Sequence, residues 1–208
     1  MDTVTLFSSV SVDGFATGRD GDLGRLHRWM FDVEAGGPTG YDDEFFRAFR
    51  DAGAILFGRR TYDSGQEPWG DDEVFEAPVF VLTHEHLDPI PKNGTVFTFV
   101  DGTPAHALAL AREAARERGV VIMGSPDVAQ QFLRDGLVDV LLLHVVPVLL
   151  GAGTPLFGAL PASVELRQTL AVPGEEVALV RYEVVNEPVA SATGNATAAS
   201  RVRTPVVS

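Results

Sequence analysis

The stretch 54-AILFGRRTYDSG-65 joins a short apolar run to two arginines through one glycine. A wholly apolar run of this length is typical of a strand covered on both faces, as in a parallel sheet. Gly58 permits a tight turn, and residues 59–61 would then begin a helix whose free N–H groups favour an anion. Two interpretations stay open: the arginines hold an anionic ligand, or they pair with nearby acids such as Asp63 and Glu67.

The composition limits the class of protein. The chain has 208 residues, 45% of them hydrophobic, and a formal net charge of −13. This predicts one domain with a sizeable core and excludes the basic footprint of nucleic-acid binding, so an anionic ligand needs local cations. Without cysteine, disulfides and thiolate metal sites are excluded, and no metal site is predicted. Neither a signal peptide nor an apolar run of about 20 residues is found, so we expect a cytoplasmic protein without a membrane span.

Apolar runs alternate with helical stretches over most of the chain, and only strands follow. Strands are expected at residues 4–10, 54–57, 79–82, 96–100, 120–123, 138–148, 166–172 and 177–185, and helices at 41–51, 104–118 and 127–134. This order predicts an α/β sheet, mostly parallel, with antiparallel strands at its C-terminal end. Residues 1–186 are expected to form the domain, and residues 187–208, which are small and polar, a disordered tail.

A second junction between a strand and a helix lies in 119-GVVIMGSPDVAQQFL-133. The strand ends at Gly124, Ser125 follows, and a helix begins at once. Ligands of α/β sheets bind outside the carboxyl ends of strands, where a glycine and a hydroxyl let a phosphate approach closely. The alternative is an ordinary turn in which Ser125 caps the helix. The stretch matches neither G-x-G-x-x-G nor a P-loop.

Five segments give the chain a resemblance to a known superfamily. They are SVSVDGFATGRDGDL, ILFGRRTYDSG, VFVLTH, VVIMGSPDVAQQFL and GLVDVLLLHVVPVLLGAGTPLF, and they cover roughly residues 3–160. The chain resembles the dihydrofolate reductase-like superfamily, in the branch of the C-terminal reductase domain of the bifunctional riboflavin-pathway deaminase-reductase. The resemblance implies that superfamily's three-layer fold, a homodimer and NADPH as the cofactor.

The resemblance also assigns residues at three strand ends to the cofactor. They are Gly58, Arg59, Arg60 and Thr61; Thr83 and His84; and Gly124 and Ser125. The first group is implied to hold phosphates, the second to lie along the adenosine ribose and its 2′-phosphate, and the third to touch the pyrophosphate. Ser125 departs from the family, which usually has a second glycine at that position.

The sequence offers several candidates for the proton donor. In dihydrofolate reductases a carboxylate on the first helix meets the pteridine ring, and the register back from Gly58 implies Asp42. Asp43 and Glu44 are close enough for a one-residue gap to exchange them with it, and Glu44 is a second candidate. Asp13 is the third, because it resembles the Asp-Gly of the family's substrate-side loop. The alternatives are acids favoured by a helix start and a loop residue that caps its own turn.

The predicted function is an NADPH-dependent reductase that transfers hydride to a C=N or C=O bond of a flat pterin- or pyrimidine-like substrate. The family default is the 5-amino-6-(5-phosphoribosylamino)uracil reductase step of riboflavin biosynthesis. The expected partner is a small heterocycle. The alternatives are a non-catalytic nucleotide-binding protein that kept the fold and a reductase with a flavin or F420-type cofactor.

Three further stretches carry expectations. Trp29 and Trp69 are placed in loops beside the cleft, where either could wall a heterocycle or pack a lid. His144, in an apolar strand, is interpreted as a core or interface histidine. The strand VDVLLLHVVPVLL around it is long enough to pack across a subunit interface, although burial within one sheet explains it equally well.

Overall fold

The computed structural model describes residues 3–31, 47–70, 75–92, 94–174 and 176–185. The candidate acids Asp42 and Glu44 and the predicted tail, residues 187–208, lie outside the described residues.

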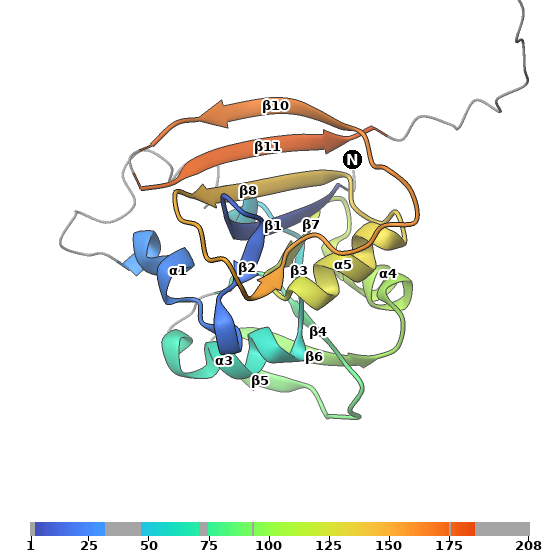
Figure 1. The fold of residues 1–208 in the computed structure, drawn as a ribbon. Helices are drawn as coiled ribbons and strands as arrows, with labels where there is room; N and C mark the ends of the chain where they lie inside the picture. Colours follow the sequence, from blue (N-terminus) through green and yellow to red (C-terminus); the bar gives the residue numbers. More distant parts are fainter. Residues whose placement is uncertain (1–2, 32–46, 71–74, 93, 175, 186–208) are drawn as a thin grey trace, which may run out of the picture.

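Within the described residues, nine strands form one sheet (Figure 1). In spatial order they are β10 (Leu166–Val172), β11 (Ala178–Val184), β8 (Val140–Val146), β1 (Val4–Ser11), β7 (Val120–Met123), β3 (Ala54–Gly58), β4 (Val79–Thr83), β6 (Thr95–Asp101) and β5 (Ile90–Lys92). The six strands from β8 to β6 pair in parallel, whereas β10, β11 and β5 pair antiparallel. The predicted α/β class, with a mostly parallel sheet and antiparallel C-terminal strands, is confirmed.

Helices cover both faces of the sheet and make three layers (Figure 1). On one face α4 (Pro104–Ala115) and α5 (Pro126–Arg134) pack on side chains such as Leu56. On the other face α3 (Arg59–Trp69) and α1 (Gly24–Phe31) cover the alternate side chains, such as Phe57. Successive residues of a strand point to opposite faces, so a strand covered on both sides must be apolar throughout. Among the described helices, none has both the length and the apolar character that a membrane crossing requires.

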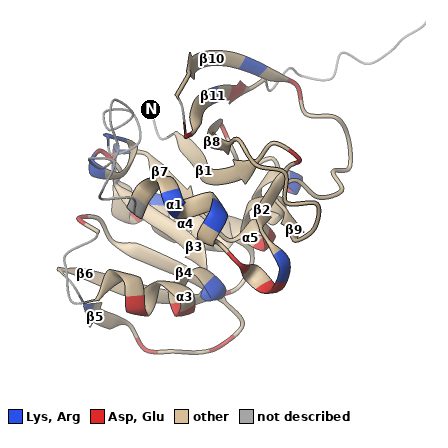
Figure 2. Cartoon of the chain, turned by 60° about the vertical axis from the view of Figure 1, so that its left-hand side comes forward, with Lys and Arg blue, Asp and Glu red and all other residues tan. Residues whose placement is uncertain are grey.

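The five central strands of the sheet carry no Lys, Arg, Asp or Glu. Figure 2 shows Lys, Arg, Asp and Glu on helices, loops and outer strands, while β1, β3, β4, β7 and β8 are free of them. The long apolar strand β8 lies between β1 and β11, with Leu141, Leu142 and Leu143 buried. Burial within its own sheet therefore accounts for the apolar character of β8.

The structure differs from the predicted elements at several places, and one of them is the strand β5, which was not expected. The helix α4 ends at Ala115, not 118, because Arg116 takes a left-handed conformation with φ of 60°. The glycine-rich stretch 11–24, for which no strand or helix was listed, contains β2 (Phe15–Thr17), which pairs with β9 (Thr154–Pro155), and the short 3₁₀ helix η1 (Arg19–Gly21). Trp29 lies in α1 and is buried, so it is not a loop residue.

Candidate functional site

The two strand-to-helix junctions meet at one edge of the sheet. The strands β3 and β7 are parallel neighbours, so their carboxyl ends lie side by side. The backbone N–H of Gly58 donates to Ser125 Oγ at 3.0 Å, and the hydroxyls of Thr61 and Ser125 lie 2.5 Å apart. Residues more than sixty positions apart in the sequence are thus joined directly. This edge brings together residues 58–61 and 124–125, two of the three groups that the resemblance assigned to the cofactor.

The close approach of the two junctions depends on glycine. A Cβ at Gly58 would lie 2.8 Å from Ser125 Oγ and 2.8 Å from Val128 Cγ2. Gly124 has φ of +55°, a left-handed conformation that glycine adopts readily. Ser125 is also left-handed, with φ of 47°, which is unfavourable for a residue with a side chain by about 1–2 kcal/mol. The hydrogen bonds to Gly58 and Thr61 hold it there.

The helices that begin at this edge receive no side-chain cap. Gly58, the N-cap of α3, has no side chain, and Ser125, the N-cap of α5, makes no capping bond because its hydroxyl is turned toward Gly58 and Thr61. Ser125 is therefore not the ordinary helix cap of the alternative interpretation. Uncapped amides and two converging helix dipoles favour an anion at this edge. A pyrophosphate fits this donor set.

Both arginines of the first junction are ion-paired. Arg59 Nε lies 2.8 Å from Asp63 Oδ1 and its Nη1 lies 2.5 Å from Glu85 Oε2, while Arg60 Nη1 lies 3.0 Å from Asp127 Oδ2. Hydrogen bonds to Asp63 and then to Glu85 raise the pKa of the Arg59 guanidinium. The pairing with Asp63 is the one that the second interpretation of the sequence expected, whereas Glu85 and Asp127 come from other elements.

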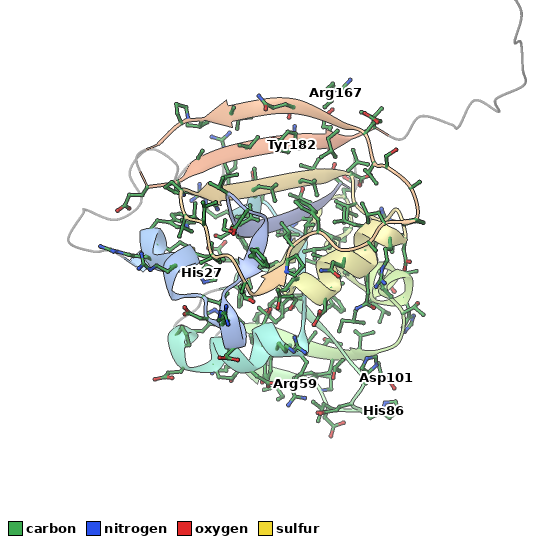
Figure 3. All side chains as sticks on the ribbon, viewed as in Figure 1. His27, Arg59, His86, Asp101, Arg167 and Tyr182 are labelled. Atoms are coloured by element: carbon green, nitrogen blue, oxygen red, sulfur yellow. The ribbon has the colours of Figure 1, made fainter. Side chains whose placement is uncertain are left out.

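The third group lies at the end of β4, next to β3. Thr83 is buried, and its Oγ1 accepts a hydrogen bond from the backbone N–H of Glu85 at 3.2 Å, while His84 is exposed. His86 Nε2 lies 3.4 Å from Asp101 Oδ2. Figure 3 shows Arg59, His86 and Asp101 along the lower border of the molecule. A shallow, open depression of about 290 Å³ is lined here by His86, Leu87, Asp88 and Phe99.

On the other side of the two junctions, the ends of β1 and β8 carry an aromatic cluster. The ring centroid of His144 lies 5.1 Å from that of Phe7 and 4.3 Å from that of Trp29. The ring centroids of Phe7 and Phe49 are 5.3 Å apart. His144 is fully buried, and burial, followed by repulsion from His27, lowers its pKa to about 3. The imidazole is therefore neutral at physiological pH, when one ring nitrogen donates and the other accepts.

Ser9 is a polar residue on the same face of the sheet as this cluster. It is the register partner of His144 across β1 and β8. Its hydroxyl is buried and has no hydrogen-bond partner among the described residues. Buried polar groups are normally paired, so this hydroxyl is an exception among the described residues.

Asp13 anchors the turn that follows β8. Its carboxylate accepts hydrogen bonds from Ser11 Oγ at 2.6 Å, from the Gly151 amide at 2.7 Å and from the Leu150 amide at 3.1 Å. The bond from Ser11, followed by that from Gly151, lowers the pKa of Asp13. A carboxylate held ionised in this way suits a positioning role better than the donation of a proton.

The sequence matches the RibD C-terminal domain over residues 2–177. The chain belongs to the RibD C-terminal domain family. It is 26% identical, over 170 residues, to the uncharacterized protein YwjB of Bacillus subtilis (strain 168). The matched region covers 78% of this chain and 86% of YwjB. The family is reductase-like, so the chain is grouped with oxidoreductases.

Solved structures agree with the RibD C-terminal fold. A putative riboflavin biosynthesis protein from Shewanella sp. PV-4 superposes with a TM-score of 0.72 at 22% identity, covering 88% of this chain and 99% of that one. Dihydrofolate reductase from Enterococcus faecalis, solved in complex with NADP(H) and RAB-propyl, superposes with a TM-score of 0.58 at 19% identity, covering 89% of this chain and 97% of that one. The fold is thus dihydrofolate reductase-like.

Sequence reasoning missed two acids at the phosphate edge of this RibD C-terminal domain. The sequence assigned no role to Glu85, and it placed Asp127 only at the start of a helix. The position of the two acids in the sequence could have identified them, because each follows a strand that is parallel to β3 and adjacent to it. Trp69 is the last residue of α3 and packs on Phe57 and Phe75, so it is not the loop residue that the sequence predicted.

Proposed function

We propose that this chain is a reductase that binds a reduced nicotinamide dinucleotide across the carboxyl ends of β3 and β7. It transfers hydride to a C=N or C=O bond of a flat pterin- or pyrimidine-like ring. NADPH is the form of the cofactor that the resemblance implies, and the uracil reductase step of riboflavin biosynthesis is the implied substrate class. The observation that carries the proposal is the contact of Ser125 Oγ with Gly58 and Thr61, which assembles two uncapped helix starts at one edge.

Different groups along this edge have different proposed roles in binding and catalysis. The amides at the starts of α3 and α5 bind the pyrophosphate, and Arg59 and Arg60 neutralise part of its charge. When bound, the cofactor supplies the hydride. Phe7 and Trp29 exclude water beside β1, and the Ser9 hydroxyl offers a hydrogen bond to a ring substituent.

The proton that completes the reduction comes from a different group. We propose Asp42, with Glu44 as the neighbouring candidate and a bound water as the alternative source. Asp13 acts on the same reaction by holding the turn at Leu150 and Gly151 against the end of β1. Replacing Asp42 by Asn is expected to lower kcat by about a hundredfold and to leave the affinity for the dinucleotide unchanged.

The assembly is proposed from the same resemblance: a cytoplasmic homodimer with a small heterocyclic substrate. Size-exclusion chromatography with light scattering measures the mass directly. A mass of twice 22.3 kDa supports the dimer, and a monomer contradicts it.

The binding test titrates the purified chain with NADPH and with NADH and follows the fluorescence of the reduced nicotinamide. We expect a Kd between about 1 µM and 1 mM for at least one of them, the range of ordinary KM values. Replacing Thr61 by Val removes the hydroxyl that contacts Ser125 and should weaken binding about tenfold. Thr169→Val is the matched control, because Thr169 lies on β10 and bonds to Arg181. Failure of both dinucleotides to bind contradicts the proposal.

The catalytic test measures the oxidation of the bound dinucleotide with a panel of pterins and pyrimidinones. Turnover with one of them supports the reductase. Tight binding with no turnover for any of them supports a non-catalytic nucleotide-binding protein instead. Binding of a flavin or a deazaflavin in place of both nicotinamide dinucleotides supports the third possibility.

A further inference from the structure

Glu85 places a carboxylate beside the phosphate edge. It follows β4, the outer neighbour of β3, and its backbone N–H is fixed by Thr83 Oγ1. Its Oε2 contacts Arg59 Nη1 at 2.5 Å, while Arg59 Nε contacts Asp63. The guanidinium that begins α3 is therefore held between two carboxylates.

Among the described residues, both arginines at the helix starts are already paired with carboxylates. Arg59 and Arg60 face three carboxylates, those of Asp63, Glu85 and Asp127, so the cluster has a net charge of −1. The amides of α3 and α5 compensate a pyrophosphate, which carries two negative charges. A ribose 2′-phosphate adds nearly two more, and it would have to compete with Glu85 for Arg59.

The position of Glu85 determines which part of a dinucleotide it meets. A pyrophosphate over β3 and β7 sends one nucleoside toward β1 and β8 and the other toward β4 and β6. The β1 side carries the buried aromatic cluster, whereas the β4 side carries Glu85 and the open depression lined by His86 and Phe99. The polar, exposed β4 side suits an adenosine, whose ribose then lies at Glu85.

A carboxylate and a guanidinium select opposite forms of this ribose. A carboxylate accepts hydrogen bonds from free ribose hydroxyls and repels a phosphate, whereas an uncommitted arginine accommodates the 2′-phosphate. Resting on the proposed function, we propose that Glu85 is a specificity-determining residue that selects the dinucleotide without a 2′-phosphate. The chain binds NADH more tightly than NADPH, in contrast to the cofactor that the resemblance implies.

The experiment measures the Kd of NADH and of NADPH by isothermal titration calorimetry for the full chain, for Glu85→Gln and for Glu183→Gln. We expect the unmodified chain to favour NADH by about tenfold, and Glu85→Gln to reduce or reverse this ratio by strengthening NADPH binding about tenfold. Glu183 is the matched control, since it is also paired with two arginines, Arg167 and Arg181, but lies on β11. Its variant should keep the ratio.

The outcomes separate the two proposals. Tighter binding of NADPH by the unmodified chain, or a ratio that Glu85→Gln does not change, overturns the inference and leaves the dinucleotide site standing. Failure of the unmodified chain to bind either dinucleotide overturns both. Competition by 5′-AMP and by adenosine 2′,5′-bisphosphate repeats the comparison without the nicotinamide, and stronger competition by the bisphosphate also overturns the inference. Glu85 is 61% exposed, so the variant is expected to fold.

Discussion

The edge of the sheet where the parallel strands end has two halves that differ in where their charges lie. We call the ends of β3 and β7 the phosphate half, and the ends of β1 and β8 the aromatic half. At the ends of β3 and β7, charged groups are exposed and paired: the Arg60 side chain is 83% exposed and lies against Asp127. At the ends of β1 and β8, the ionisable His144 is fully buried among aromatic rings and is neutral. A single exposed pair such as that of Arg60 is inexpensive to separate, so Arg60 can leave Asp127 for a ligand, whereas the buried neutral imidazole of His144 is enclosed by the rings around it.

The largest effect on the phosphate half is expected from Gly58→Ala. The new Cβ would overlap Ser125 Oγ and Val128 Cγ2, both at 2.8 Å, and should force the two junctions apart. We expect a loss of about 1–3 kcal/mol in stability and a rise of more than tenfold in the Kd for the dinucleotide. Denaturant titration and calorimetry measure the two quantities.

The control for this variant is Gly53→Ala, at the other end of the same strand. A Cβ there would lie 2.6 Å from the Cβ of Ala115, so a similar loss of stability is expected. The Kd of its folded fraction should not change. An equal rise in Kd for both variants would show that the strand ends do not form the binding edge.

The aromatic half is tested through pH. The lowered pKa of His144 means that, between about pH 6.5 and 3, the unfolded chain binds a proton that the folded chain does not. Stability therefore rises with pH across this window, by about 3 kcal/mol from pH 4 to pH 7 for this one group. His27, whose pKa is also lowered by burial, adds to the same trend.

Urea denaturation at pH 4 and pH 7 measures this effect. His144→Leu removes the titrating imidazole. The difference in unfolding free energy between pH 4 and pH 7 should therefore be smaller in this variant than in the unmodified chain, whatever its stability at pH 7. His106→Leu, an exposed position on α4, should keep the full dependence. The same slope for His144→Leu and the unmodified chain would rule out a buried neutral imidazole.

A smaller effect is expected from Arg59→Ala. It removes a guanidinium from the phosphate half and leaves Asp63 and Glu85 without their partner, so the Kd for NADH should rise about tenfold. Arg167→Ala is the same change in an arginine paired with Glu183, at the far end of the sheet (Figure 3). Equal Kd values for the two variants would show that Arg59 does not contribute to the binding of the dinucleotide.

The smallest effect is expected from Asp13→Asn. The carboxamide oxygen can still accept a hydrogen bond at the turn, and a carboxyl with a lowered pKa is a poor proton donor near neutrality. We expect a change in kcat of less than about threefold and a small fall in Tm. A drop of about a hundredfold in kcat would identify Asp13 as the proton donor.

The sequence predicted the strands well because their cause is local. A strand covered on both faces must be apolar throughout, and the runs at 54–57, 79–82 and 120–123 could be recognised without their neighbours. The helix α1 has a weak local signal, since it begins at Gly24 and follows a glycine-rich stretch. Its burial comes from contacts such as that of Trp29 with His144, which is more than a hundred residues away.

The backbone arrangement of the candidate site could be predicted from the sequence, but the partners of its side chains could not. Gly58 and Gly124 mark strand ends, and the parallel sheet brings those ends together. The contact between Arg59 and Glu85 depends on β4 being the outer neighbour of β3, and this order cannot be read from either segment alone. The choice between a ligand-binding arginine and a paired arginine was therefore open in the sequence, and the structure shows that the pairs form.

A crystal structure of the chain with bound NADH tests the central claim most directly. We expect pyrophosphate oxygens within hydrogen-bond distance of the amides that begin α3 and α5, beside Gly58 and Ser125. A dinucleotide bound at any other place on the molecule, with the contact between Ser125 and Gly58 left facing solvent, would contradict it.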